Sequence, residues 1–345
     1  MIPNWPTASG APVAHAVLRT VPEDFRVEEQ LGFEPEGQGE HAFLYLEKRE
    51  LTTPELAEQL STLSGVHPRD ISFSGMKDRN AVTRQWFSVG LAGKPEPDWR
   101  GLEAGGQVRV LEATRHRRKL RRGVHRANRF AIRLRQLQGE RAAIEQRLAD
   151  IRAQGVPNYF GAQRFGRDGA TLSQARSWMQ RGGRISRNRQ SIYLSCLRSL
   201  LFNQLLATRV AAGNWNRLCA GDVCMLAGSH SLFAVGQPDA ELERRCAEAD
   251  LHPALPLWGK GRDALAQAAA GYREQLAGES AVCGFLEQKG LQLDWRASRL
   301  MADDFCWQFC EDDSLLLTFE LGAGGFATAL IAGFAETVAS GNERE

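Results

Sequence analysis

The sequence lacks the features of membrane-spanning and secreted proteins. No apolar run approaches the ~18 residues that a membrane-spanning helix needs, so we expect no membrane partner. The first residues contain neither a basic nor an apolar region, so we expect no secretory signal. The 7 cysteines are odd in number and include no Cys-x-x-Cys pair, which favours free thiols in a reducing compartment. These absences together predict a cytoplasmic protein.

Motifs for cofactors and metals are also missing. No Gly-x-Gly-x-x-Gly follows a strand-like segment and no Walker-type Gly-Lys-Ser/Thr occurs, so we expect no nucleotide cofactor. No Gly-x-Ser-x-Gly elbow indicates a serine hydrolase. The 7 histidines are scattered and none lies at zinc-ligand spacing from a cysteine, so we expect no metal. The glycine-rich segment 322–326 could hold a phosphate at a helix N-terminus, but a strand-to-helix turn is the simpler interpretation.

The composition is that of a soluble globular chain, with 43% hydrophobic and 24% charged residues among 345. At about 150 residues per domain, this length predicts roughly two domains. Strand-like segments gather at both ends of the chain, and helix-like segments fill the middle. We therefore predict an α+β fold in which residues 1–154 plus 302–345 form one domain and residues 155–301 are inserted into it.

Helices are predicted where apolar residues recur at helical spacing between recognisable ends. The clearest begins at Thr52, because Thr52-Thr-Pro-Glu55 forms a capping box with proline in the first turn, and Gly65 ends it. Further helices are expected at residues 140–154, 195–210, 239–250, 262–278, 279–291 and 326–338. The Pro/Gly-rich segment 252–262 is expected to be a loop.

Residues 73–89 predict two strands joined by a tight turn that carries an acidic residue. Gly75 permits a tight backbone path, and Asp78 lies between the cations of Lys77 and Arg79, which favour its ionised form. An ionised carboxylate on such a turn can act as a nucleophile or a base. Taken alone, the stretch is better interpreted as an ordinary turn with a solvated ion pair.

The strongest charge feature is the segment 115–135, which we call the basic stripe. It contains 10 Lys or Arg residues and no acid, although the net charge of the whole chain is only +2. A solvated surface usually mixes both signs, so a one-sign run inside a folded domain favours a polyanionic partner such as nucleic acid. Phe130, Ile132 and Leu134 alternate as in a buried strand, which argues against a disordered basic tail.

Several islands of the sequence, taken in order, resemble the tRNA pseudouridine synthase D (TruD) family. The longest are Phe73-Ser-Gly-Met-Lys-Asp78-Arg-Asn-Ala-Val-Thr83 with Gln85-Trp86, and Val156-Pro-Asn-Tyr-Phe-Gly-Ala-Gln-Arg-Phe-Gly166. Shorter islands are Pro22-Glu-Asp-Phe25, Gly39-Glu-His41, His116-Arg-Arg-Lys-Leu120, Asn128-Arg-Phe130, Arg198-Ser-Leu-Leu-Phe-Asn203 and Gly325-Phe-Ala-Thr328. They extend over nearly the whole chain, which is therefore identified as a member of this family.

The resemblance implies a fold, an activity and a partner. The family fold is a pseudouridine-synthase-type mixed, largely antiparallel sheet flanked by helices, with an inserted α/β TRUD domain, in agreement with an insertion at 155–301. Enzymes of the family isomerise uridine to pseudouridine in tRNA without a cofactor, and bacterial members act at position 13 near the D-stem. The expected partner is thus tRNA, and the expected state is a monomer.

The resemblance also implies roles for individual residues. Asp78 matches the catalytic aspartate, and Arg19 falls where the family has a basic residue, commonly lysine, that pairs with it. Phe25, Asn128 and Phe326 match residues around the target nucleotide. The aromatic that stacks on the uracil corresponds to Phe130. A glycine that usually precedes the asparagine is Ala127 here. Phosphate contacts to tRNA are expected from Lys77, Arg79, Arg117, Arg118, Lys119 and Arg121.

Two alternatives fit parts of the same pattern. A non-catalytic RNA-binding protein or RNA chaperone would use the basic stripe without needing Asp78. A deaminase would need a His/Cys zinc set, which the sequence lacks. For the aspartate itself, covalent attack and removal of a sugar proton are both compatible with the sequence.

Overall fold

The computed structural model describes residues 4–229, 231–261 and 264–339, and the chain forms two compact units. The insertion unit, as we call the first, comprises Met1–Val13, Arg141–Met301 and Phe326–Phe334. The second, the sheet unit, comprises Ala14–Glu140, Ala302–Gly325 and Ala335–Glu345. The outer ends of the predicted domain 1–154 plus 302–345, at residues 1–3 and 340–345, lie outside the described residues.

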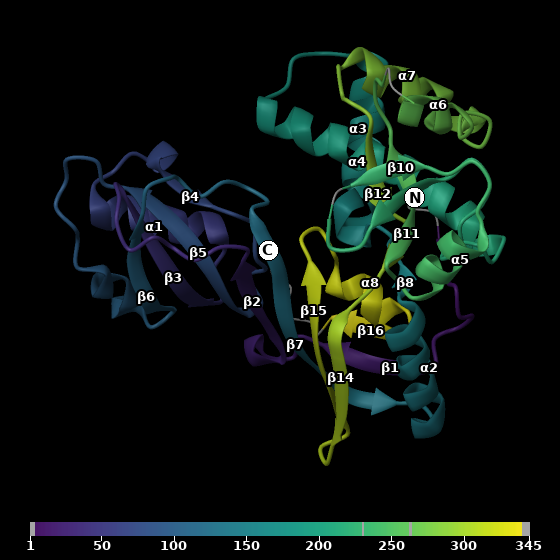
Figure 1. Ribbon diagram of the computed structural model, residues 1–345. Helices are drawn as coiled ribbons and strands as arrows, with labels where there is room; N and C mark the ends of the chain where they lie inside the picture. The colour runs from purple at the N-terminus through teal and green to yellow at the C-terminus, as the bar shows by residue number, and fades with distance from the viewer. Residues whose placement is uncertain (1–3, 230, 262–263, 340–345) are drawn as a thin grey trace. The chain divides into compact units, whose positions relative to one another are not determined.

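The sheet unit is built on a 10-stranded, largely antiparallel sheet (Figure 1). Its main path runs in the order β14-β15-β7-β2-β5-β3-β6, with β1 between β7 and β16, and β4 beside β5. Pairing is parallel for β1–β16 and β2–β5 and antiparallel for the other neighbours. The strands are β1 (Ala14–Leu18), β2 (Phe25–Leu31), β3 (His41–Arg49), β4 (Ile71–Phe73), β5 (Val82–Gly90), β6 (Val108–His116), β7 (His125–Gln138), β14 (Asp303–Cys310), β15 (Ser314–Gly322) and β16 (Ala335–Ala339).

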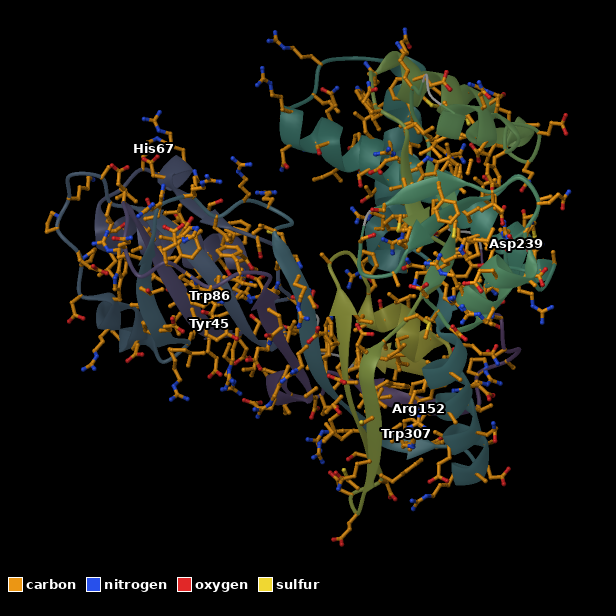
Figure 2. The ribbon with its side chains drawn as sticks, viewed as in Figure 1. Tyr45, His67, Trp86, Arg152, Asp239 and Trp307 are labelled. Atoms are coloured by element: carbon orange, nitrogen blue, oxygen red, sulfur yellow. The ribbon has the colours of Figure 1, made fainter. Side chains whose placement is uncertain are left out.

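Helix α1 (Thr53–Ser64) packs on one face of β3 and β5. The predicted start of this helix is confirmed, because the Thr52 hydroxyl accepts the Glu55 N–H and the Glu55 carboxylate accepts the Thr52 N–H at 2.7 Å. Its leucines pack with buried residues of β3 and β5 such as Leu46. The opposite face carries Tyr45 and Trp86, whose rings stack with centroids 5.0 Å apart (Figure 2). The two faces of these strands therefore have different environments, as the alternation of a β-strand requires.

The insertion unit is centred on the long helix α4 (Arg187–Ala211), which packs into a large apolar cluster. A four-stranded sheet of order β10-β9-β11-β12 and a two-stranded sheet, β13-β8, accompany the helices. The strands are β8 (Val156–Pro157), β9 (Val223–Leu226), β10 (Leu232–Ala234), β11 (Leu251–Leu257), β12 (Asp294–Ala297) and β13 (Arg299–Leu300). The other helices are α2 (Arg141–Gln154), α3 (Ala170–Arg181), α5 (Ala240–Ala247), α6 (Ala264–Ala270), α7 (Ser280–Gln288) and α8 (Ala327–Ala332).

The compact units divide the chain differently from the predicted domains. Residues 4–13, 141–154 and 326–334 group with the middle of the chain instead of with the sheet unit. Close packing around Gly333 shows why, since a Cβ added there would lie 2.8 Å from Val156 Cγ1 and 3.1 Å from Ile151 Cδ1. Helix α2, strand β8 and helix α8 are thus packed together. The family-domain boundaries at 155 and 301 stay a prediction.

Two predictions of secondary structure are wrong. The expected helix 326–338 is only α8, followed by Gly333 and then by β16, which pairs in parallel with β1. The expected loop 252–262 contains β11, and Pro253 and Pro256 fit in it because each half of the strand is paired on one side. In both segments a long-range strand pairing outweighs the local sequence preference. The expected helix 262–278 is found only as α6, which ends at Ala270, and residues 262–263 lie outside the described residues.

Candidate active site

Asp78 lies in the segment that connects β4 to β5, so the predicted strand–turn–strand around it is confirmed. This turn is held by side chains of neighbouring elements. The Thr53 hydroxyl accepts the Lys77 backbone N–H at 3.0 Å, and the Gln85 amide donates to the Gly75 carbonyl at 3.1 Å. Thr53 also donates to the Gln85 side chain at 2.9 Å, which joins the two supports into one buried network. The backbone that precedes Asp78 is therefore held by buried side chains.

The cation that contacts Asp78 is Arg19. Its Nη2 lies 2.6 Å from Asp78 Oδ2, and the exposed fractions of the two side chains are 21% and 54%. Arg19 follows β1 with φ at 61°, a left-handed conformation that costs a residue with a Cβ about 1–2 kcal/mol. Its guanidinium lies 4.2 Å from the centre of the Phe25 ring. The carboxylate is thus both reachable from solvent and held by a charge-assisted hydrogen bond.

The two cations next to Asp78 in sequence point elsewhere. The Lys77 ammonium is 2.6 Å from Glu29 Oε2, and these side chains are 6% and 0% exposed. Glu29 also accepts the backbone N–H of Trp86 at 3.2 Å. Arg79 lies 3.8 Å from Glu55 on the surface. The expectation that Lys77 contacts tRNA phosphates is therefore not supported, because its ammonium is buried against an acidic partner.

Phe25, Phe130 and Asn128, three residues expected near the nucleotide, lie on adjacent strands of the sheet unit. Phe25 and Phe130 are both buried, with ring centroids 6.2 Å apart in an edge-to-face arrangement, and Phe130 stacks on Phe319 at 5.2 Å. Asn128 is opposite Glu29 across the β2–β7 pair, and its buried Oδ1 has no hydrogen-bond partner. An unpaired buried acceptor is costly, so this atom is a candidate to accept a hydrogen bond from a ligand.

Phe326 belongs to the insertion unit, just before α8. Its ring centroid is 6.0 Å from that of Phe160, and the Arg164 and Arg296 guanidiniums lie 6.0 Å and 5.8 Å from its centre. Burial lowers the pKa of Arg296. Phe326 is therefore part of a cationic and aromatic cluster that the sequence did not reveal as a group.

The basic stripe is partly neutralised by distant acids. Arg117 pairs with Glu36 at 3.2 Å, and the Lys119 ammonium donates to the Arg69 carbonyl. Other stripe arginines pair with acids of the sheet unit, as Arg115–Glu96, Arg126–Glu320, Arg133–Asp312 and Arg135–Asp24. Within the ranges that the structure describes, the exposed Arg118 and Arg121 form no ion pair. These two residues remain the most available of the expected phosphate contacts.

Sequence reasoning missed Lys48, which lies directly beneath the Asp78 turn. Its side chain is fully buried on β3, and its ammonium donates to the carbonyls of Asp78 at 2.8 Å and Leu51 at 2.6 Å. Burial lowers the pKa of Lys48 to about 8, against an opposing attraction from Asp78. One feature of the sequence could have indicated Lys48. Leu44, Leu46 and Lys48 are every second residue of a strand and so lie on one face, where a lysine is unusual.

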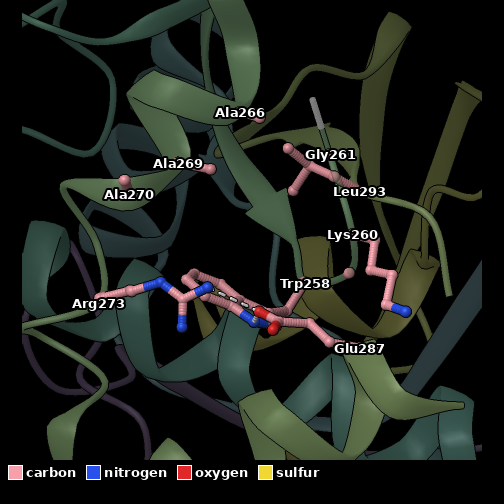
Figure 3. Close-up of a pocket in the computed structure, with 10 residues that line it drawn as sticks. Trp258, Lys260, Gly261, Ala266, Ala269, Ala270, Arg273, Glu287 and Leu293 are labelled. Carbon is pink, nitrogen blue, oxygen red and sulfur yellow. Dashed lines mark hydrogen bonds and ion pairs between the residues drawn. The ribbon is translucent and has the colours of Figure 1, made fainter. Parts of the chain in front are cut away.

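Two hollows lie away from Asp78 or on the other face of the sheet. One of about 200 Å³ in the insertion unit contains Glu287, which accepts hydrogen bonds from Trp258 at 2.9 Å and Arg273 at 2.8 Å (Figure 3). The side chains of Trp258, Arg273 and Glu287 satisfy one another, and we assign no ligand to the hollow. A second, of about 240 Å³, lies on the face of the sheet opposite Asp78 and is lined partly by Arg26, Arg84 and Arg129.

Neither a metal cluster nor a membrane helix is found in the described residues. Among them, no three His, Cys, Asp or Glu side chains are grouped so that they could hold a metal ion. None of the helices in the same residues has the length and apolar content that a bilayer crossing requires.

Comparison with known proteins identifies the family. The model of tRNA pseudouridine synthase D (TruD) matches residues 7–173 and 170–334. A curated tRNA pseudouridine synthase D from Methylococcus capsulatus is 46% identical over 330 residues, which cover 95% of this chain and 93% of that protein. One from Pseudomonas aeruginosa is 44% identical over 338 residues, covering 97% and 95%. A solved structure from Methanosarcina mazei with the same family name has a TM-score of 0.65 over 96% of both chains at 20% identity, and so shares the fold. The chain therefore belongs to the tRNA pseudouridine synthase D (TruD) family and is, like its curated relatives, an isomerase.

Proposed function

We propose that this protein converts a uridine of tRNA into pseudouridine, at uridine 13 near the D-stem, and that Asp78 is its catalytic residue. The observation that carries the proposal is the solvent-reachable Asp78 carboxylate held 2.6 Å from the Arg19 guanidinium on a braced turn. The names of the curated relatives support the activity. We expect the protein to act as a monomer.

The reaction explains why a carboxylate and no redox cofactor is needed. The N1–C1′ glycosidic bond breaks, the detached uracil turns, and C5 bonds to C1′ while C5 loses a proton and N1 gains one. Atoms and electrons balance without an oxidant or reductant. The Asp78 carboxylate either attacks the sugar or removes a sugar proton, and both routes require the negative charge that Arg19 stabilises.

The uridine must leave the RNA stack to reach Asp78, at a cost of a few kcal/mol. Phe25 and Phe130 are proposed to contact the flipped nucleotide, with Phe130 stacking on the uracil. A contact by Phe326 is proposed from the family resemblance alone. Stacking on an aromatic ring contributes about 1–3 kcal/mol per base, which offsets the cost of flipping. The free Oδ1 of Asn128 would accept a hydrogen bond from the nucleotide.

The tRNA backbone would be held by exposed arginines. Arg79 is exposed beside Asp78, and Arg118 and Arg121 are exposed on the loop after β6. Such cations position RNA without reading its sequence. Contacts by Arg117 and Lys119 require them to leave or share their present partners. The arginines Arg184, Arg187 and Arg189 of the insertion unit would add further phosphate contacts.

Tritium release from tRNA labelled at C5 of uridine tests this function. Wild-type protein should release tritium, while Asp78→Asn should lower the rate at least about 10³-fold and leave tRNA affinity within about twofold. A tRNA with cytidine at position 13 should bind and release none. If wild-type protein binds tRNA but releases no tritium from any tRNA, it is an RNA-binding protein and the proposed activity is wrong.

A further inference from the structure

Lys48 is buried without a carboxylate at its ammonium. Its side chain is fully buried, and in the described residues it takes part in no ion pair. Both acceptors of its ammonium are backbone carbonyls, those of Asp78 and Leu51. Removing a charged ammonium from water is expensive unless it is paired, and carbonyls only partly compensate. An apolar residue would fill this position on β3 at lower cost, so the lysine calls for an explanation beyond packing.

The carbonyl that Lys48 holds belongs to Asp78 itself. The turn between β4 and β5 has supports at Gly75 and at the Lys77 N–H, from the Gln85 and Thr53 side chains. These supports precede Asp78 in the chain. The bond from Lys48, at 2.8 Å, is the contact that reaches the peptide plane immediately after the Asp78 Cα. It therefore limits the rotation that would carry the carboxylate away from Arg19.

We propose that Lys48 is a positioning residue that holds the backbone of Asp78 so that its carboxylate stays in the reactive orientation at Arg19. This inference rests on the proposed function, in which Asp78 is the catalytic group. Lys48 does not touch the substrate and acts through the Asp78 carbonyl. A displacement of about 1 Å at a catalytic group can cost about 100-fold in rate, which sets the size of the expected effect.

The charges around Lys48 support this role. Asp78 attracts the ammonium and Glu55 does so more weakly, while Lys77 repels it. Attraction is mutual, so the ammonium also favours negative charge at Asp78, in addition to the exposed Arg19 contact. The lysine therefore orients Asp78 by a hydrogen bond and adds to its electrostatic environment.

The test compares Lys48→Met with Lys94→Met in single-turnover tritium release from C5-labelled tRNA at saturating protein. Lys94 is a matched control, because its exposed ammonium also donates to a backbone carbonyl, that of Gly65 at the end of α1, at 2.6 Å. Lys48→Met should lower the single-turnover rate about 100-fold and leave the tRNA dissociation constant within about twofold. Lys94→Met should match wild type in both. Circular dichroism at the assay temperature checks that each variant is folded.

A second variant covers the case in which Lys48→Met fails to fold. Lys48→Gln keeps an N–H donor without charge and should retain more of the rate than Lys48→Met. A folded Lys48 variant that turns over within about twofold of wild type would overturn the inference, as would an equal loss in Lys94→Met or a loss confined to tRNA affinity. Failure of the proposed function looks different, since the wild-type protein itself would then release no tritium.

Discussion

Residues 77 and 78 are neighbours in the chain, yet their side chains lie in opposite environments. Lys77 forms a buried ion pair with Glu29, whereas Asp78 forms a partly exposed one with Arg19, and both pairs are 2.6 Å long. The bond length is the same, so burial distinguishes them. A buried pair can anchor a turn but cannot meet a substrate, and an exposed carboxylate can meet a substrate but contributes little to stability. The comparison therefore assigns a structural role to the Lys77–Glu29 pair and a catalytic role to the Asp78–Arg19 pair.

The largest expected effect breaks the buried pair. Glu29→Gln leaves the Lys77 ammonium buried without its charge partner, which should lower the free energy of unfolding by about 3–5 kcal/mol. Urea denaturation measures the change. The double variant Glu29→Gln, Lys77→Met removes both charges and should recover most of the loss. A Glu29→Gln protein as stable as wild type would show that the pair does not anchor the turn.

Breaking the exposed pair should lower the rate strongly and change the stability little. Arg19→Ala should lower the single-turnover rate about 100-fold, because the charged donor at the reactive carboxylate is removed. Stability should change by less than about 1 kcal/mol, since water screens the pair. Arg19→Lys keeps the charge but lacks the planar guanidinium, so its single-turnover rate should lie between those of wild type and Arg19→Ala. Turnover at the wild-type rate by Arg19→Ala would remove Arg19 from the catalytic site.

The exposed arginines of the basic stripe allow a smaller test of the same contrast between paired and unpaired cations. The double variant Arg118→Ala, Arg121→Ala should weaken tRNA binding and flatten its salt dependence, by roughly 0.7–0.9 in log–log slope for each phosphate that the protein no longer neutralises. Arg117→Ala should have less effect, because Glu36 already neutralises that side chain. Binding titrations at several salt concentrations measure the slopes. Equal slopes for wild type and the double variant would show that Arg118 and Arg121 do not contact the tRNA phosphates.

A last expected effect is a pH dependence of stability from Lys48. Burial lowers its pKa to about 8 in the folded protein, whereas the unfolded chain has the ordinary value of 10.5. Between these values the unfolded chain binds more protons, so the contribution of Lys48 makes the free energy of unfolding rise with pH. Below about pH 8 both states are protonated and this contribution stays constant. Urea denaturation of wild type and Lys48→Met across this window measures the effect. The free energy of unfolding of wild type, minus that of Lys48→Met, should increase with pH, and a constant value would contradict the lowered pKa.

The parts of the fold that depend on local pattern could be predicted from the sequence. The Thr52 cap and the strands around Asp78 are examples, because short-range alternation and turn chemistry determine them. Partners of the charged groups could not be predicted in this way. Glu29 is 48 residues from Lys77 and Arg19 is 59 residues from Asp78, so only the β2–β5 and β1–β7 pairings bring them together. For Asp78, the family resemblance supplied Arg19 where local sequence pointed to Lys77 and Arg79.

Strand pairing over long separations explains the other differences. β16 pairs with β1 from the opposite end of the chain, so residues 335–339 form a strand in spite of a helix-like local pattern. The stripe acids are also distant in sequence, as Glu320 is from Arg126 at a separation of 194 residues. The basic stripe contains no acid in sequence, but the fold brings acids from distant segments next to its arginines.

The contrast between the two ion pairs is tested most directly by measuring tritium release and unfolding free energy on Asp78→Asn and Glu29→Gln side by side. Asp78→Asn should lose at least about 10³-fold in single-turnover rate with its unfolding free energy within about 1 kcal/mol of wild type. Glu29→Gln should lose about 3–5 kcal/mol of stability and, where it remains folded, keep a measurable rate. Full turnover by a folded Asp78→Asn protein would contradict the assignment of chemistry to the exposed pair.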